Sequence, residues 1–225
     1  ELAAYSPFER IGQRDFGALQ PRELDELLPL VRRLARRMSN YQSRRFRSVG
    51  NSDQLDLRRS LRSNLLRSDR IDYLEFRERK IKKARLVLLC DVSRSMDLYA
   101  RFLIEFMLAF QRSASRLHTF VFSTSLTHIS SALRFADSTQ VLDQLGEQVD
   151  HWSGGTRIGY CLEQFRRDFG QKYLGNKSVC IILSDGWDNG EPDLLERQMH
   201  WLKKNTKKII WLNPLAGQDD YQPTT

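Results

Sequence analysis

Hydrophobic and polar positions follow two different rhythms along this chain of 225 residues. Residues 21–38 carry apolar side chains at steps of three and four, which is typical of an amphipathic helix. From residue 85 onward, short and nearly continuous apolar runs alternate with segments of helical period. Such runs are typical of strands covered on both faces, and the helices between them predict a mostly parallel sheet.

The second rhythm predicts an α/β fold with a doubly wound, mostly parallel sheet and helices on both faces. Strands are expected at 85–91, 117–123, 126–130, 178–184 and 207–212. Helices are expected between them at 97–115, 138–149, 157–170 and 192–204. The first part is expected to hold the helix at 21–38, a loop at 40–54, a short basic helix at 55–67 and an edge strand at 71–77.

Positive charge is concentrated in the first part of the chain. Residues 31–80 hold 15 Lys or Arg and six Asp or Glu, a net charge of +9, whereas residues 86–225 are close to neutral. The whole chain carries +8. This asymmetry predicts two functional units, which are a basic, mainly helical N-terminal extension over 1–80 and the α/β domain over 81–225.

Composition narrows the class of protein further. No apolar run approaches the roughly 18 residues that a membrane-spanning helix needs, so no membrane span is expected. The three cysteines, Cys90, Cys161 and Cys180, are not closely spaced, which argues against a zinc cluster. Buried, reduced thiols and a cytoplasmic location are the expectation.

Unusual polar residues follow two of the predicted strands. Asp91, Ser93 and Ser95 come directly after one apolar run, and Asp185 follows another. Thr156 lies in a glycine-containing loop just before a predicted helix. Ligands of open parallel sheets bind at the carboxyl ends of the strands, where such loops meet. These five residues are therefore expected to converge at one edge of the sheet.

Two carboxylates and three hydroxyls are hard oxygen donors, which is the ligand type of Mg²⁺. Hydroxyl ligands add no charge, so the ion would accept one more anionic ligand from a partner protein. Two enzymatic alternatives start from the same residues. A serine nucleophile needs a nearby base, but only His151 lies on a candidate loop and there is no GxSxG elbow. An aspartyl-phosphate enzyme that uses Asp91 as its phosphate acceptor would need a second aspartate at position 93, where this sequence has Ser93.

Further residues are expected to support the ligands or to line the rim of the site, namely Arg94, Gly155, Gly186, Trp187 and Asp188. The basic segment contributes Arg58, Arg59, Arg62, Arg67 and Arg70. These arginines either face solvent or dock an acidic protein partner. Neither an aromatic stacking platform nor a recognised binding module accompanies them, so the pattern does not favour nucleic acid. No P-loop or GxGxxG follows a strand, so nucleotide binding is not expected either.

The segments that carry these residues also match a known family. DVSRS at 91–95 resembles the DxSxS motif of von Willebrand factor A (VWA) domains, and the threonine of SGGT and the aspartate of SDG resemble its other two parts. The resemblance implies a metal-ion-dependent adhesion site. In that site, Ser93, Ser95 and Thr156 would contact the ion directly or through water, while the two aspartates would hold waters or the metal.

One position departs from the usual pattern of this motif. Arg94 stands where glycine is frequent, which is expected to make the loop stiffer and more cationic.

A finer resemblance covers most of residues 55–225. LDLRRSLRSN, ARLVLLCDVSRSM, DHWSGGTRIG, ILSDGWDNG and WLNPL are similar to the CoxE-like branch of bacterial VWA proteins. Proteins of that branch are commonly paired with MoxR-type AAA+ ATPases, in the maturation, cofactor insertion or remodelling of metalloenzymes.

The resemblance therefore implies a non-enzymatic adaptor. Its Mg²⁺ site, with Mn²⁺ or Ca²⁺ as alternative ions, would grip an acidic side chain of a client metalloenzyme, and the ATPase would supply force. The alternatives are a magnesium-chelatase-like subunit and a magnesium-dependent phosphohydrolase that uses Asp91.

Overall fold

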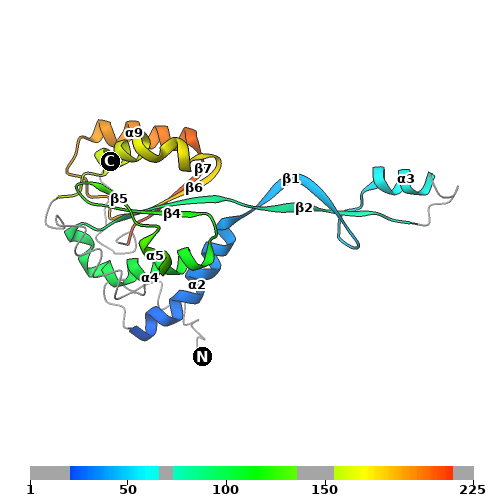
Figure 1. Ribbon diagram of the computed structural model, residues 1–225, viewed down its shortest axis with the longest axis horizontal. Coiled ribbons are helices and arrows are strands. Elements are labelled where there is room, and N and C mark those ends of the chain that lie inside the picture. Colours follow the sequence, from blue (N-terminus) through cyan, green and yellow to red (C-terminus); the bar gives the residue numbers. More distant parts are fainter. Residues whose placement is uncertain (1–20, 66–72, 136–154, 215–225) are drawn as a thin grey trace, which may run out of the picture. The chain divides into compact units, whose positions relative to one another are not determined.

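The computed structural model of the protein describes residues 21–65, 73–135 and 155–214 (Figure 1). They divide into two compact units. The sheet unit comprises 21–39 and the described residues from 84 onward, and the hairpin unit comprises the described residues of 40–83. The boundary expected at residue 80 does not coincide with this division, because the helix at 21–38 belongs with the sheet.

The described strands of the sheet unit lie in the order β5-β4-β3-β6-β7. They are β3 (Arg85–Asp91), β4 (Leu117–Phe122), β5 (Leu126–His128), β6 (Gly175–Leu183) and β7 (Thr206–Leu212). All neighbouring strands run parallel except β5, which pairs antiparallel with β4 at one edge. The doubly wound, mostly parallel α/β fold predicted from the sequence is thereby confirmed.

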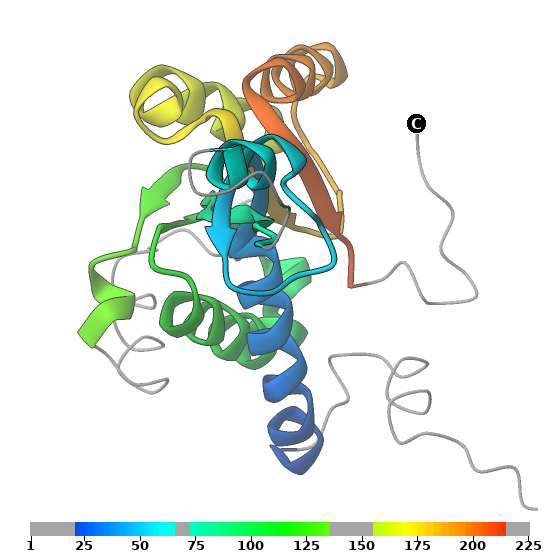
Figure 2. The ribbon, with the colours of Figure 1, turned by 90° about the vertical axis from the view of Figure 1, so that its right-hand side faces the viewer.

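Helices cover both faces of this sheet, as two perpendicular views show (Figures 1 and 2). One face carries α2 (Pro21–Ser39), α4 (Ala100–Ser113) and α5 (Ala132–Phe135), and the other carries α7 (Ile158–Phe165) and α9 (Pro192–Asn205). A 3₁₀ turn, η2 (Arg94–Tyr99), precedes α4, and a π-helical turn, η3 (Arg166–Gly170), connects α7 to α8 (Gln171–Tyr173). The helices expected at 97–115 and 157–170 therefore each contain an irregular turn. The helix expected at 138–149 lies outside the described residues.

Burial explains why β3 lies in the middle of the sheet. The residues from Leu86 to Cys90 are all fully buried, and Leu89 is paired with Phe120 of β4 and with Ile182 of β6. Burial of one leucine side chain contributes about 1.5–3 kcal/mol, so helices are needed on both faces of such a strand. The face under α7 holds aromatic contacts, with the Phe120 ring 5.1 Å from the edge-on ring of Phe165.

The order of the strands decides where a ligand can bind. The chain leaves β3 for β4 on one side and later reaches β6 on the other side. In doubly wound sheets, ligands bind at the carboxyl ends of the strands where the winding direction reverses. Asp91 is the last residue of β3, and Asp185 follows the end of β6 by two positions. Both aspartates therefore lie at this switch point.

The hairpin unit pairs β1 (Asn40–Val49) antiparallel with β2 (Phe76–Lys83), and α3 (Leu57–Leu65) lies between them in sequence. The loop expected at 40–54 is thus wrong, and the strand expected at 71–77 lies further along the chain. A two-stranded ribbon has little core to face, so its side chains need not alternate between apolar and polar. Phe46 instead packs under the guanidinium of Arg77, 4.6 Å from the ring centre.

No helix in the described ranges is both long enough and apolar enough to cross a membrane.

Candidate functional site

Asp91 ends β3 and is fully buried. Its Oδ1 accepts a hydrogen bond from the backbone N–H of Ser93 at 2.9 Å, and its Oδ2 accepts one from the hydroxyl of Ser184 at 2.7 Å. Burial raises the pKa of Asp91 to about 6, although these hydrogen bonds lower it, and the nearby Asp185 carboxylate adds to the rise. A cation beside the two carboxylates would stabilise their charged forms.

Ser93 directly precedes η2, and Ser95 is the second residue of that turn. Ser93 is buried, Ser95 is exposed, and their hydroxyl oxygens are 3.1 Å apart. Ser93 occupies the N-cap position of η2, but its hydroxyl does not cap the helix. Neighbouring ligands of an octahedral ion with bonds of 2.0–2.1 Å lie about 2.9 Å apart, so the two hydroxyls have a spacing that one Mg²⁺ could accept.

Asp185 lies on the loop after β6 and is also buried. Its Oδ1 accepts a hydrogen bond from the backbone N–H of Trp187 at 3.0 Å, and its carbonyl oxygen accepts one from the amide of Asn213 at 2.9 Å. Its Oδ2 is buried and has no hydrogen-bond partner among the described residues. A buried carboxylate oxygen without a partner is costly unless a further group binds there.

Thr156 is buried on the loop before α7. Its carbonyl oxygen accepts a hydrogen bond from the backbone N–H of Asn189 at 2.8 Å, and the next residue, Arg157, donates its N–H to the carbonyl of Ser123 at 3.0 Å. These bonds join the loop to the segments after β6 and after β4, which flank β3. At Gly155, a Cβ would lie 1.9 Å from the side-chain nitrogen of Asn189, so any other residue here would require the Asn189 side chain to move.

Asp188 has a different role from the other two aspartates of the site. Its carboxylate accepts hydrogen bonds from the backbone N–H groups of Ile158 at 2.9 Å, Gly159 at 3.2 Å and Gly190 at 2.9 Å. The first two groups belong to the first turn of α7, where a carboxylate also interacts favourably with the helix dipole. Asp188 therefore caps α7 from another loop and fixes the helix that follows Thr156.

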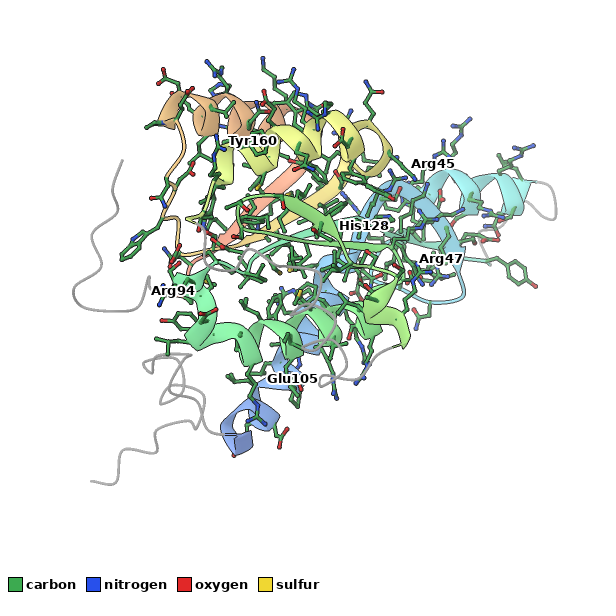
Figure 3. The ribbon with its side chains drawn as sticks, turned by 60° about the vertical axis from the view of Figure 1, so that its left-hand side comes forward. Arg45, Arg47, Arg94, Glu105, His128 and Tyr160 are labelled. Carbon is green, nitrogen blue, oxygen red and sulfur yellow. The ribbon has the colours of Figure 1, made fainter. Side chains whose placement is uncertain are left out.

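The rim of the site is exposed and partly cationic. Arg94 and Arg157 are exposed, and Arg94 lies on the outer surface at the start of η2 (Figure 3). The Trp187 side chain is 64% exposed, so it is not needed to pack its own loop. Gly186 has a φ of +86°, a left-handed conformation that glycine adopts without strain, and it turns the chain between Asp185 and Trp187.

The structure thus brings most of the predicted ligands together. Asp91, Ser93 and Ser95 are joined by direct hydrogen bonds, and Asp185 is linked to Asp91 through the neighbouring Ser184. The loop of Thr156 is held at the same ends of the strands by a backbone hydrogen bond from Asn189 to Thr156. Nowhere in the described ranges do three His, Cys, Asp or Glu residues gather into a metal-binding group. A metal at this edge would therefore depend on hydroxyls as well as carboxylates, and Oδ2 of Asp185, which has no hydrogen-bond partner in the described part of the chain, fits such an ion.

Sequence reasoning missed two supporting residues. Ser184 is fully buried, donates to Asp91, and accepts a hydrogen bond from the backbone N–H of Gly186 at 3.1 Å. Asn189 holds the Thr156 loop. Ser184 carried a usable signal, because it is a polar residue at the end of an apolar strand and directly precedes Asp185. Asn189 carried no such signal in the sequence, because its hydrogen bond is to Thr156, on a loop more than 30 residues earlier.

The family model described as "VWA domain containing CoxE-like protein" matches residues 30–225. The chain belongs to this family. The matched region includes both the candidate metal site and the hairpin unit of this CoxE-like protein. Among curated proteins, none matches the sequence significantly.

Several solved structures are similar to the CoxE-like chain at low identity. Proximal thread matrix protein 1 from the mussel byssus is 20% identical with a TM-score of 0.43, and the match covers 58% of this chain and 37% of that one. The manganese-loaded TRAP protein of Plasmodium vivax is 19% identical with a TM-score of 0.41, covering 63% and 65%. An aerotolerance-related membrane protein of Bacteroides fragilis is 12% identical with a TM-score of 0.39, covering 63% and 77%. The CoxE-like chain thus spans little more than a third of the mussel protein.

The arginines predicted to dock a partner belong to the hairpin unit of the CoxE-like chain. Arg58, Arg59 and Arg62 lie on α3 and are exposed. Arg59 forms an ion pair with Glu75 at 3.9 Å. Arg67 and Arg70 lie outside the described residues.

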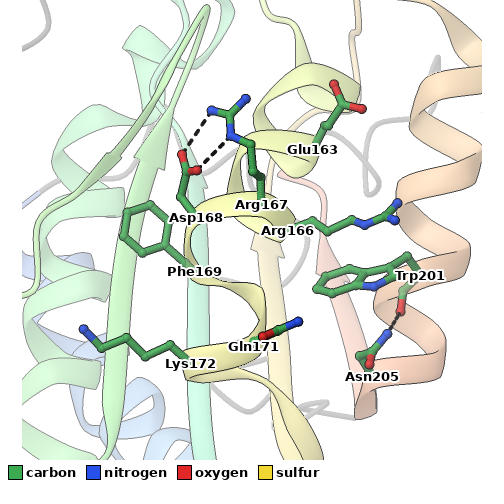
Figure 4. Close-up of a pocket in the computed structure, with 9 residues that line it drawn as sticks. All are labelled: Glu163, Arg166, Arg167, Asp168, Phe169, Gln171, Lys172, Trp201 and Asn205. Atoms are coloured by element: carbon green, nitrogen blue, oxygen red, sulfur yellow. Dashed lines mark hydrogen bonds and ion pairs between the residues drawn. The ribbon is translucent and has the colours of Figure 1, made fainter.

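A surface pocket of about 860 Å³ lies between the η3–α8 segment and α9 of the CoxE-like chain (Figure 4). This segment leads into the start of β6, and α9 ends just before β7, so the pocket lies near the amino ends of these strands. The candidate metal site lies at the carboxyl ends. Several of its polar groups bond to one another. Arg167 donates to Asp168 at 2.8 Å, and Asn205 donates to the carbonyl oxygen of Trp201 at 2.8 Å.

Proposed function

We propose that this protein is a non-enzymatic adaptor that grips an acidic residue of a partner protein through a divalent metal ion, with Mg²⁺ as the native ion. The observation that carries the proposal is the buried Oδ2 of Asp185, which has no hydrogen-bond partner among the described residues and lies next to the buried carboxylate of Asp91. Asp91, Asp185, Ser93, Ser95 and Thr156 would hold the ion. The ion would supply a positive charge able to take one more carboxylate ligand.

The environment of Asp91 supports binding rather than phosphoryl transfer. Asp91 has no solvent-exposed surface that a substrate phosphate could reach, whereas each of its oxygens accepts only one hydrogen bond and keeps a lone pair for an ion or a metal-bound water. Thiol chemistry is also disfavoured. Cys90, Cys161 and Cys180 are buried and free, and burial raises the pKa of the Cys161 and Cys180 thiols to about 12.

The rim supports an acidic protein partner. Arg94 and Arg157 add positive charge at the exposed edge, and the exposed indole of Trp187 offers apolar contact area. A partner carboxylate that approached the metal would meet both features. Aromatic and arginine side chains of this kind are the residue types enriched at protein interfaces.

Membership of the CoxE-like family supports a more specific role. We propose a MoxR-type AAA+ ATPase as the motor and a metalloenzyme that is being matured or remodelled as the client, both in the cytoplasm. The adaptor would select the client through the metal site, and the ATPase would supply force. A magnesium-chelatase-like subunit would share the same site and differ only in the client.

The test is metal-dependent capture of a MoxR-type ATPase and its client from the source organism's extract, with Mg²⁺ or with EDTA. The isosteric substitution Asp185→Asn removes the carboxylate charge, and Asp97→Asn, an exposed aspartate in η2, is the matched control. Retention by the wild type and Asp97→Asn only with Mg²⁺, and loss in Asp185→Asn, is the expected result. Capture that EDTA leaves unchanged would contradict the proposal. Phosphate release from p-nitrophenyl phosphate that Asp91→Asn abolishes would favour the phosphohydrolase.

A further inference from the structure

Helix α3 of the hairpin unit has its polar and apolar faces reversed. Its buried residues are Ser60 and Asn64, each only 3% exposed. Its leucines face outward, with Leu57 64%, Leu61 49% and Leu65 80% exposed. Surface helices of globular proteins normally turn their apolar stripe towards the core. We call Leu57, Leu61 and Leu65 the leucine face.

Hydrogen bonds hold the inner face of α3. The Asn64 amide donates to the carbonyl of Tyr73 at 2.7 Å and accepts from the N–H of the same residue at 3.0 Å. The Ser60 hydroxyl accepts the backbone N–H of Glu75 at 2.8 Å. The orientation of α3 is therefore fixed by specific polar contacts. Rolling the helix to bury its leucines would break these bonds and leave buried polar groups unpaired.

The leucine face is regular enough to match another helix. Its residues lie four positions apart, on adjacent turns of one side, and span about 12 Å along the axis. Arg58 and Arg62 lie three positions before Leu61 and Leu65, so the helical period places each of them beside the next leucine of the stripe, and both are exposed. An apolar stripe bordered by cations is complementary to an amphipathic helix that carries carboxylates beside its own apolar stripe.

The charge of the hairpin unit indicates which kind of partner can bind the leucine face. Residues 40–83 hold 13 Lys or Arg and six Asp or Glu, a net charge of +7 out of +8 for the whole chain. A second copy of so basic a unit would be repelled. Nucleic acid would satisfy the arginines but leave the leucines facing water. An acidic amphipathic helix satisfies both.

We propose that the leucine face, with Arg58 and Arg62, is a docking site for an acidic amphipathic helix of another protein. Leucines would pack against the apolar stripe of that helix, and the two arginines would pair with its carboxylates. The site uses none of the candidate metal ligands. Binding here is therefore independent of Mg²⁺, and failure of one proposal would leave the other standing.

The experiment uses the full chain in EDTA and a fluorescein-labelled synthetic helix, with leucines four residues apart flanked by glutamates. A scrambled peptide of the same composition controls for charge alone. The variants are the triple change Leu57→Ser, Leu61→Ser, Leu65→Ser and the pair Arg58→Glu, Arg62→Glu. Matched controls are Leu98→Ser, at a residue 74% exposed in η2, and Arg101→Glu, at an exposed residue of α4. Fluorescence anisotropy measures affinity, and urea unfolding measures stability.

We expect each multiple variant to weaken binding by about tenfold or more, with control variants within about twofold of the wild type and unfolding unchanged. The scrambled peptide should bind at least about tenfold more weakly than the ordered one. The proposal is overturned if the wild type does not bind, if the leucine variant binds equally well, or if the scrambled peptide is equivalent.

Other partners of the leucine face would each give a different experimental result. Phosphatidylserine vesicles or duplex DNA that bind in place of the peptide, and lose binding in the leucine variant, would reassign the face. A concentration-dependent mass that the leucine variant abolishes would indicate a second copy instead. A leucine variant with lowered unfolding stability would show that the leucines pack within this chain. Each of these three results would overturn the proposal.

Discussion

The two units of this protein use burial in opposite ways. The sheet unit buries apolar strands such as β3 and places its polar residues at one edge, where Asp91 and Asp185 lie. In the hairpin unit, α3 turns Ser60 and Asn64 inward and exposes its leucines. An antiparallel pair of strands is only marginally stable by itself, so the hairpin unit depends on specific hydrogen bonds. The sheet unit therefore gains its stability from apolar burial around the candidate site, whereas the hairpin unit leaves an apolar helix face exposed.

Removal of a large core side chain should have the largest effect and should affect only the sheet unit. Phe120 is fully buried, and Phe120→Ala is expected to lower the free energy of unfolding by about 3–5 kcal/mol, because it removes apolar burial and leaves a cavity. The matched change at an outward leucine, Leu61→Ala, should stay within about 0.5 kcal/mol. Urea denaturation measures both. Equal losses would mean that Leu61 is as deeply packed as Phe120.

The hairpin unit should be sensitive to loss of a polar side chain instead. Asn64→Ala removes the amide that bonds to both backbone groups of Tyr73, and buried groups left unpaired cost about 1–3 kcal/mol. Amide exchange in α3 and at residues 73–75 should accelerate, while exchange in β3 stays unchanged. Leu65→Ser serves as the control because it leaves these bonds intact. Unchanged exchange in Asn64→Ala would contradict the inverted packing of α3.

The cap of α7 should matter less than either change. Asp188→Ala removes the carboxylate that accepts the first N–H groups of α7, with an expected cost of about 0.5–2 kcal/mol. Asp188→Asn keeps an acceptor and should cost less. Asp193→Ala, at an exposed residue in the first turn of α9, is the comparison for a carboxylate near a helix start. Thermal unfolding of the three variants compares their stabilities. An Asp188→Ala variant as stable as the wild type would contradict the capping role.

A smaller effect should appear as a dependence of stability on pH. Burial lowers the pKa of His118 to about 4, with a further contribution from His128, whose own pKa is also lowered mainly by burial. An unfolded histidine titrates near 6.5, so between about pH 6.5 and 4 the unfolded chain takes up protons that the folded chain does not. The free energy of unfolding should therefore decrease as pH falls through this window.

The substitution His118→Phe keeps a ring against Tyr173 and should flatten that decrease. His200→Phe, at an exposed residue of α9, should not. The slope should stay well below the limit of about 1.4 kcal/mol per pH unit for one proton, because both histidines are partly exposed to water. A slope that is the same in His118→Phe and in the wild type would contradict this assignment.

Local sequence was sufficient to predict the sheet and to place most of the candidate ligands at the carboxyl ends of its strands. β3 is a continuous apolar run that can only be buried on both faces, and Asp91 stands out because it ends that run. Parallel topology then brings Asp185 to the same edge. The features that sequence did not reveal depend on distant partners. Ser184 bonds to a residue 93 positions earlier, and Asp188 caps a helix 30 positions earlier.

β1 was missed for a related physical reason. Its polar residues read as a loop, because a strand in a two-stranded ribbon does not need one apolar face. Pairing with β2, more than 30 residues away in most of the register, is what makes it a strand. The reversal of α3 was equally hidden, since its leucine spacing predicts a buried stripe that the structure turns outward.

Direct titration with Mg²⁺ shows whether an ion binds at the carboxyl ends of β3 and β6. Isothermal calorimetry on the purified chain should show binding of one ion by the wild type and by Asp97→Asn. Asp185→Asn should bind at least about tenfold more weakly, with its unfolding transition preserved. No uptake of Mg²⁺, Mn²⁺ or Ca²⁺ by the wild type, or equal affinity in Asp185→Asn, would contradict a metal site at the carboxyl ends of β3 and β6.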